Sequence, residues 1–189
     1  MQTLMKTSKC WACLCLLFPI AFCGCWSYIS KEAAQRFESR QGAISVTVYP
    51  VNVVRGDTVE HDADLAGKLM TFLRQENLAE PVLATESANI SFKWGHNQAK
   101  MAQQSAIAFA STVKEAGIQT EYALLVEILC NKSETWVGGV HFYLCDRDGL
   151  LANGGLTNSH WEEFEEIKPH DRQGGYEVAI RMLRNQWRR

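Results

Sequence analysis

The chain has 189 residues, 47% of them hydrophobic, and a formal net charge of −2. This balance argues against nucleic acid as a partner, because a nucleic-acid-binding domain presents a basic face. It also gives no sign of an electrostatic hold on anionic lipid. Without an N-terminal export segment the chain keeps 165 residues, which is enough for one domain with a hydrophobic core.

The N-terminus has the parts of an export signal. Two lysines precede an apolar run over residues 11–22, and Gly24 and Cys25 follow it. The run is short for a membrane-spanning helix, which needs about 20 apolar residues. A small residue before a cysteine resembles a bacterial lipoprotein signal, in which Cys25 is lipidated and becomes the new N-terminus. The alternatives are an uncleaved anchor over about residues 10–29 and a secretory signal that is cut near Gly24.

These features predict three parts: a signal peptide over residues 1–24, a lipid-attached tether over 25–42 and a folded domain over 43–189. Cleavage removes the two lysines, so the formal charge of the mature chain moves from −2 to −4. Acyl groups such as palmitate, and not charge, would therefore hold the protein to the membrane. Stable anchoring of this kind needs more than one chain.

The first half of the domain alternates strand and helix patterns. Polar and apolar residues alternate in several segments, as in half-buried strands, and apolar residues recur at helical spacing after a capping Asp62. The predicted elements are a strand over residues 43–49 that continues over 51–54 after Pro50, a helix from Asp62 to Asn77, and short strands over 81–84 and 90–94.

The second half of the domain predicts a long helix followed by a meander. Asn97 can cap a helix that Gly117 closes, and a nearly continuous apolar run over residues 122–130 is typical of a central strand. The remaining predicted elements are strands over 137–145 and from 150, a turn at 146–149, and a last helix from about Gln173. This order predicts an α/β (α+β) fold with a single mixed sheet of about four to six strands and helices mainly on one face.

Several of these segments together follow a known layout. They are the strand over residues 44–50, the helix after Asp62, the helix that ends at Ala116 and Gly117, the strand over 122–128 and the strand that closes on residues 146–149. With the export cysteine in front, this layout resembles the small α/β domains of bacterial envelope lipoproteins, such as the periplasmic activators of penicillin-binding proteins and the curli-secretion lipoproteins. The resemblance covers roughly residues 43–152. It implies a non-enzymatic role in binding another envelope protein or in assembly.

Only two of the seven cysteines, Cys130 and Cys145, belong to the folded domain. In an oxidising compartment such a pair suggests a disulfide. The predicted hairpin instead places Cys145 near Tyr122, far from Cys130, and a bridge needs alpha carbons within about 7 Å. We expect two free, buried thiols, with a bridge as the alternative.

Candidate catalytic groups have simpler explanations. A thiol nucleophile would need one of these cysteines beside His141 or His160. The usual sequence context of a cysteine protease is missing, and Cys130 lies in an apolar run where its thiol would be inert. No catalytic residue is therefore predicted.

Candidate metal ligands also have structural explanations. His61, Asp62 and Asp64 could bind a metal, but Asp62 is better used as a helix cap. Asp146 and Asp148 fit a hairpin turn better than a calcium loop, because the later glycine and glutamate spacing is absent. No metal site and no cofactor are predicted.

The segment over residues 158–166 has the most unusual composition in the domain, with two large aromatic residues among four acids. We predict that Asn158, His160, Trp161 and Phe164 form a binding surface, since aromatic residues are enriched at interfaces. The alternative is that Trp161 and Phe164 cover the edge of the sheet while the acids face water.

The sequence thus predicts a membrane-anchored envelope lipoprotein that acts as a protein-binding or assembly module. Its expected partners are the membrane, through a lipid on Cys25, and another envelope protein. We expect it to face the periplasm, with the outer membrane favoured. The alternative function is a small envelope hydrolase that uses an unidentified site.

Overall fold

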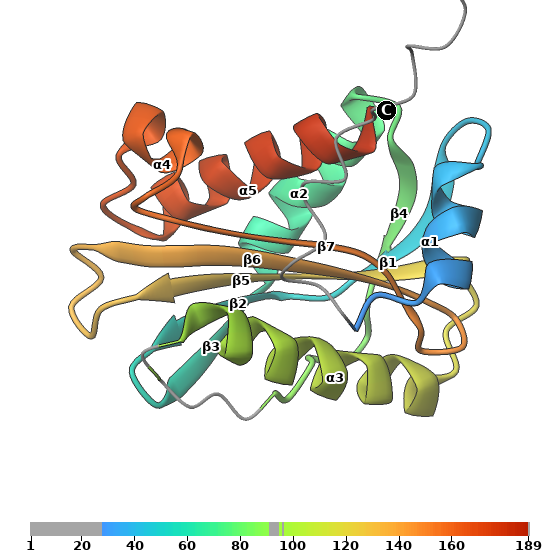
Figure 1. Cartoon of the computed structure of the whole chain (residues 1–189), viewed down its shortest axis with the longest axis horizontal. Helices are drawn as coiled ribbons and strands as arrows, with labels where there is room; N and C mark the ends of the chain where they lie inside the picture. Colours follow the sequence, from blue (N-terminus) through green and yellow to red (C-terminus); the bar gives the residue numbers. More distant parts are fainter. Residues whose placement is uncertain (1–27, 91–94, 96, 189) are drawn as a thin grey trace, which may run out of the picture.

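The computed structural model of the chain describes residues 28–90, 95 and 97–188 (Figure 1). The predicted lipidation site Cys25 lies outside the described residues, as do residues 91–94 of the strand predicted over 90–94. The described residues form one open mixed sheet with helices packed against it, which confirms the predicted fold class. None of the described helices combines the length and the apolar character that a membrane crossing requires.

The described part of the chain has seven strands and five helices. The strands are β1 (Ile44–Val48), β2 (Val51–Arg55), β3 (Thr58–Asp62), β4 (Ala79–Leu83), β5 (Tyr122–Cys130), β6 (Val137–Asp146) and β7 (Leu151–Asn158). The helices are α1 (Lys31–Glu38), α2 (Ala63–Gln75), α3 (Gln98–Ala116), α4 (Glu162–Ile167) and α5 (Arg172–Trp187).

Strand β5 is the centre of the sheet. On one side it pairs in parallel with both β1 and β2, which are two parts of one extended path that Pro50 interrupts. On the other side it pairs antiparallel with β6, and β6 pairs antiparallel with β7. The outer edge of the β1–β2 path is covered by two different strands, because β4 pairs with β1 and β3 pairs with β2. All nine residues of β5 are buried, as the apolar run predicts.

Both faces of the sheet are covered (Figure 1). Helices α1, α2, α4 and α5 place side chains in the apolar cluster on the face of Leu124, Val126 and Ile128. Helix α3 alone packs on the face of Leu125 and Tyr143. The helices thus lie mainly on one face, as predicted, and α3 covers the other because β5 is apolar on both sides.

Two differences from the predicted elements have physical reasons. The sheet has more strands than expected because the polar segment of β3 forms a strand by pairing with β2, although its sequence lacks an apolar alternation. Helix α1 lies in the segment expected to be a tether with a helical turn or two around Lys31 to Glu38, and the difference is that Ala33 and Phe37 of α1 are buried in the core. The described part of residues 25–42 therefore packs on the domain.

The thiol prediction is confirmed. Cys145 pairs with Ala123 and Cys130 pairs with Val137, at opposite ends of the β5–β6 hairpin. Both cysteines are free and buried. Burial raises the pKa of the Cys130 thiol to about 11 and also raises that of Cys145, so neither is an activated nucleophile.

Candidate functional site

A tight turn over residues 158–161, here called the Trp161 turn, connects β7 to α4. The Trp161 amide donates to the carbonyl oxygen of Asn158 at 3.0 Å, and the His160 amide donates to Oδ1 of Asn158 at 3.0 Å. Asparagine favours such turns because its side chain can accept a hydrogen bond from the backbone two residues on. The turn is therefore held in one shape by Asn158 and does not depend on a partner.

The Trp161 turn separates the four predicted binding residues. Trp161 is 45% exposed and His160 is also exposed, whereas Asn158 is half-buried. Phe164 is only 4% exposed and belongs to the core cluster beneath α4 and α5. Phe164 therefore holds α4 on the domain, and Trp161 is the one of the two aromatic side chains that faces solvent.

A second exposed tryptophan, which the sequence analysis did not predict, lies at the same end of the sheet. Trp136 is 48% exposed and lies three residues before Gly139, the pairing partner of Asn158. Oδ1 of Asn131 accepts the amide of Trp136 at 3.2 Å and holds the β5–β6 loop. The indole lies across Gly138, since a Cβ there would come within 2.8 Å of the ring.

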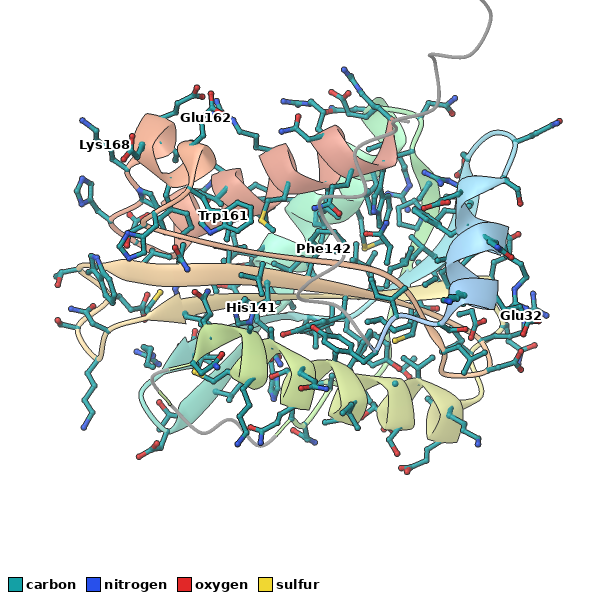
Figure 2. All side chains as sticks on the ribbon, viewed as in Figure 1. Glu32, His141, Phe142, Trp161, Glu162 and Lys168 are labelled. Carbon is teal, nitrogen blue, oxygen red and sulfur yellow. The ribbon has the colours of Figure 1, made fainter. Side chains whose placement is uncertain are left out.

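Acidic side chains stand beside Trp161. Glu162 and Glu165 of α4 are exposed, and neither forms an ion pair with any described residue, whereas Glu166 pairs with Arg181. Figure 2 shows both Glu162 and Trp161 at the α4 end of the molecule. The surface around the Trp161 turn thus combines a large apolar ring with unpaired negative charge.

Beneath α3 the sheet carries a row of polar residues, here called the polar row. His61, Asn52, Glu127 and His141 are successive Cα partners across β3, β2, β5 and β6. Glu127 is 1% exposed, and Asn52 and His141 are fully buried. Figure 2 shows His141 on the α3 side of the sheet and Phe142 on the other side. Buried charged groups are rare unless they are paired, so this row is a specific feature of the fold.

The polar row is hydrogen-bonded through Tyr143. The Tyr143 hydroxyl donates to Oε2 of Glu127 at 2.8 Å and lies 3.1 Å from Nδ1 of His141. Nδ1 of His141 is 3.5 Å from the same Glu127 oxygen. Burial, and then the Glu127 carboxylate, raise the pKa of Tyr143 well above its ordinary value, so the phenol keeps its proton and acts as the donor.

Two side-chain amides connect the polar row to the Trp161 turn. Nε2 of Gln98, at the start of α3, lies 3.1 Å from Nε2 of His141 and donates to the Thr157 carbonyl at 3.1 Å. Nδ2 of Asn158 donates to Oε1 of Gln98 at 2.6 Å. A continuous path of hydrogen bonds therefore joins a buried carboxylate to the backbone of the turn that presents Trp161.

The sequence contained one signal for the polar row. Glu127 is the single charged residue in the run over 122–130, and a charge inside a central strand calls for a buried partner. The partners themselves come from β6, β7 and α3. Their meeting depends on strand register and not on sequence spacing.

The buried groups do not form an accessible catalytic centre. A substrate has no route to His141 or Glu127 while both are covered by α3. Asp62 caps α2 by accepting the amide of Leu65 at 2.9 Å, and it also accepts from Arg172. Asp146 accepts two amides of the β6–β7 turn, so it serves as a turn residue. No group of three or more metal-binding side chains occurs in the described part of the chain.

A groove of about 570 Å³ lies between α2 and α5. Apolar side chains, among them Phe72 and Tyr176, line its floor, and its rim is polar. Its three cations are engaged, since Lys68 donates to Gln173, Arg181 pairs with Glu166 and Arg184 pairs with Glu76. The groove is open to solvent and lies on the sheet face opposite the polar row, so it does not bring the buried polar groups to a ligand.

Comparisons with known proteins leave the family open. No protein-family model matches the chain, and no curated protein matches its sequence. Among solved structures, the chain is similar to the C-terminal domain of LpoB from Salmonella enterica, with 15% identity and a TM-score of 0.36. The match covers 66% of this chain and 90% of that domain. A likeness at this level carries no conclusion about function.

Proposed function

We propose that the protein is an envelope lipoprotein, anchored through a lipid on Cys25, that binds or assembles another envelope protein. In this proposal it faces the periplasm. The N-terminal apolar run before Gly24 and Cys25 supports the anchor. The Trp161 turn supports the binding role, and the path from polar row to turn gives that surface a fixed geometry.

The exposure of Trp161 on a pre-formed turn is the observation that carries the binding role. Trp161 is 45% exposed, so part of its apolar ring contacts water in the isolated protein, which is unfavourable. The hydrogen bonds of Asn158 fix the backbone before any partner arrives, so binding would not have to order this loop. Rigid aromatic side chains of this kind are enriched among the residues that dominate binding energy.

The binding role is tested by photo-crosslinking followed by affinity measurement. A photoreactive amino acid at position 161 of the native envelope protein should crosslink a discrete partner that mass spectrometry identifies. The purified partner should then bind Trp161→Ala at least about 2 kcal/mol more weakly, roughly a 30-fold loss. Ile107→Ala is the matched control, because Ile107 is 58% exposed on α3, away from the turn.

The two possible roles of Trp161 give opposite results. A contact residue should lose affinity on truncation and leave the melting temperature nearly unchanged. A residue that covers the sheet edge should lower the melting temperature and leave the affinity of the folded fraction alone. The second result would return the Trp161 turn to a structural role.

The anchor is tested by mass spectrometry of the native protein from its envelope. We expect a mature chain that begins at Cys25 and carries acyl groups. An intact segment over residues 1–24, or an unmodified Cys25, would contradict the lipoprotein proposal.

A further inference from the structure

We infer that protonation of His141 is transmitted through Gln98 and Asn158 to the backbone of the Trp161 turn, so that the candidate binding surface depends on the charge of the His141 ring. The inference concerns the regulation of that surface and rests on the proposed binding role.

Two backbone groups fix the orientation of both amides on the path. The Thr157 carbonyl can only accept, so the Gln98 group that faces it at 3.1 Å is the NH₂ group. The His160 amide can only donate, so the Asn158 group that faces it at 3.0 Å is the carbonyl oxygen. The remaining contact, from Nδ2 of Asn158 to Oε1 of Gln98 at 2.6 Å, agrees with both assignments.

These orientations fix the charge state of His141. The Gln98 NH₂ group lies 3.1 Å from Nε2 of His141, so this ring nitrogen must accept and carries no hydrogen. The hydrogen of the neutral ring is then on Nδ1 and points toward the Tyr143 hydroxyl at 3.1 Å, which donates in turn to Glu127 at 2.8 Å. Every contact of the path is satisfied by a neutral imidazole.

A protonated His141 does not fit this arrangement. Both ring nitrogens of the imidazolium are donors, so Nε2–H would face the NH₂ group of Gln98. Rotation of the Gln98 amide restores an acceptor at His141 but removes its bonds to Thr157 and to Asn158. It also turns the Gln98 NH₂ group toward the NH₂ group of Asn158, which must rotate as well. The rotated Asn158 amide presents a donor to the His160 amide, so the turn loses one of its two hydrogen bonds and keeps the backbone bond from Trp161 to the Asn158 carbonyl.

The surroundings of His141 contain a counter-charge for the imidazolium. Among the described residues, the titratable groups within contact distance of it are Glu127 from β5, at 3.5 Å, and Tyr143 from its own strand, and Tyr28 acts on Tyr143 from the segment before α1. Helix α3 faces this cluster with the uncharged Gln98 and Ser105, and β7 faces it with a backbone carbonyl. The polar row continues on the far side of Glu127 with the uncharged Asn52 and then His61.

The polar row also has unused hydrogen-bonding capacity. Oε1 of Glu127 and Nδ2 of Asn52 are buried without a hydrogen-bond partner among the described residues. A second carboxylate oxygen therefore stays available for an imidazolium. Gly139 makes room for the amide that must rotate, because a Cβ there would lie 2.1 Å from Nε2 of Gln98.

The test is hydrogen exchange at the His160 amide of the isolated full chain in detergent, at pH 7.5 and pH 5.0. Protection factors, which correct for the intrinsic effect of pH on exchange, are compared. NMR titration of the imidazole signals reports the charge of His141 in the same samples. We expect protection of the His160 amide to fall roughly threefold to tenfold as His141 gains its proton, which is the loss of one net hydrogen bond.

Three variants separate the path from other effects of acid. His141→Gln keeps a neutral polar group and should remove the pH dependence. Gln98→Leu leaves His141 intact but cuts the path, so the imidazole should titrate without an effect on the His160 amide. His170→Gln, an exposed histidine between α4 and α5, should behave like the unmodified protein. If His141→Gln does not fold, Gln98→Leu carries the test.

The inference is overturned if the His160 amide keeps its protection while His141 titrates, or if His141 gains no proton before the domain unfolds. It is equally overturned if Gln98→Leu retains the pH dependence. Partner capture plays no part in these measurements. A failure of the binding proposal at Trp161 would therefore not affect the exchange result. Unchanged exchange would likewise not contradict a crosslinked partner.

Discussion

Replacement of Phe37 by alanine tests whether α1 is part of the folded domain. Phe37 is 1% exposed, and its ring packs edge-on against Tyr122 at 5.7 Å and against Trp187 at 5.6 Å between centroids. The guanidinium of Arg40 lies 3.6 Å from the Phe37 ring centroid. These contacts join the N-terminal helix to the central strand and to the end of α5, so the ring fills a site that the rest of the domain builds.

The expected loss is large for a residue so near the start of the domain. Truncation of a buried phenylalanine to alanine costs about 3–5 kcal/mol, since it removes apolar contact and leaves a cavity. For a domain of this size each 1 kcal/mol shifts the melting temperature by about 2–4 °C, so we expect a fall of roughly 6–20 °C.

Urea unfolding of the full chain, followed by far-UV circular dichroism, measures the free energy of unfolding directly. Phe37→Leu keeps an apolar side chain in the site and should lose less than the alanine variant. The exposed Ile107→Ala should stay within about 0.5 kcal/mol of the parent protein. A loss below 1 kcal/mol for Phe37→Ala would show that α1 is not docked and that residues 25–42 act as the tether the sequence predicts.

Two further predictions concern the thiols and the acid response. Unfolded, unreduced protein should show two reactive thiols, from Cys130 and Cys145. In the native protein both should react slowly at pH 8, because burial raises both thiol pKa values. Absence of any free thiol from these two cysteines would contradict the strand register. Hydrogen bonds from Arg172 lower the pKa of Glu60 and Glu134, so their contribution to stability is present above the unfolded value of 4.5 and is lost as the pH falls through the lower folded values. Arg172→Gln should therefore be less stable at pH 7, and the gap to the parent protein in urea unfolding should shrink below pH 4.5; a gap that is constant with pH would contradict this account.

The parts of the fold that follow from local chemistry could be predicted from the sequence. Asp62 and Asn97 accept amides at the starts of α2 and α3, and Gly117 ends α3 with a φ of +59°. The apolar run over 122–130 is the central strand. Local spacing did not separate the two aromatic residues, because Trp161, Phe164 and Ile167 follow one another at intervals of three.

The rest depended on contacts between distant segments. Strand β3 has a polar sequence and is a strand because β2 supplies its hydrogen bonds. Helix α1 is short and polar and is held by a docking site made from the central strand β5 and the end of α5. The path from Glu127 to Asn158 joins three strands and a helix, and no periodicity in the sequence relates these residues.

The position of β5 between the β1–β2 path and β6 has a consequence for the order in which the chain folds. Strand β6 pairs with β5, and β7 with β6, through short hairpins, whereas β1 pairs with a strand that begins at residue 122. Contacts so distant in sequence form slowly, because a long loop must close before they are made. We therefore expect the β5–β7 meander to form first and the N-terminal strands to dock on it. If the chain crosses a membrane unfolded, strands β1 and β2 stay without their partner β5 until residue 130 has emerged. During that time chaperones on the far side can bind the unpaired N-terminal strands.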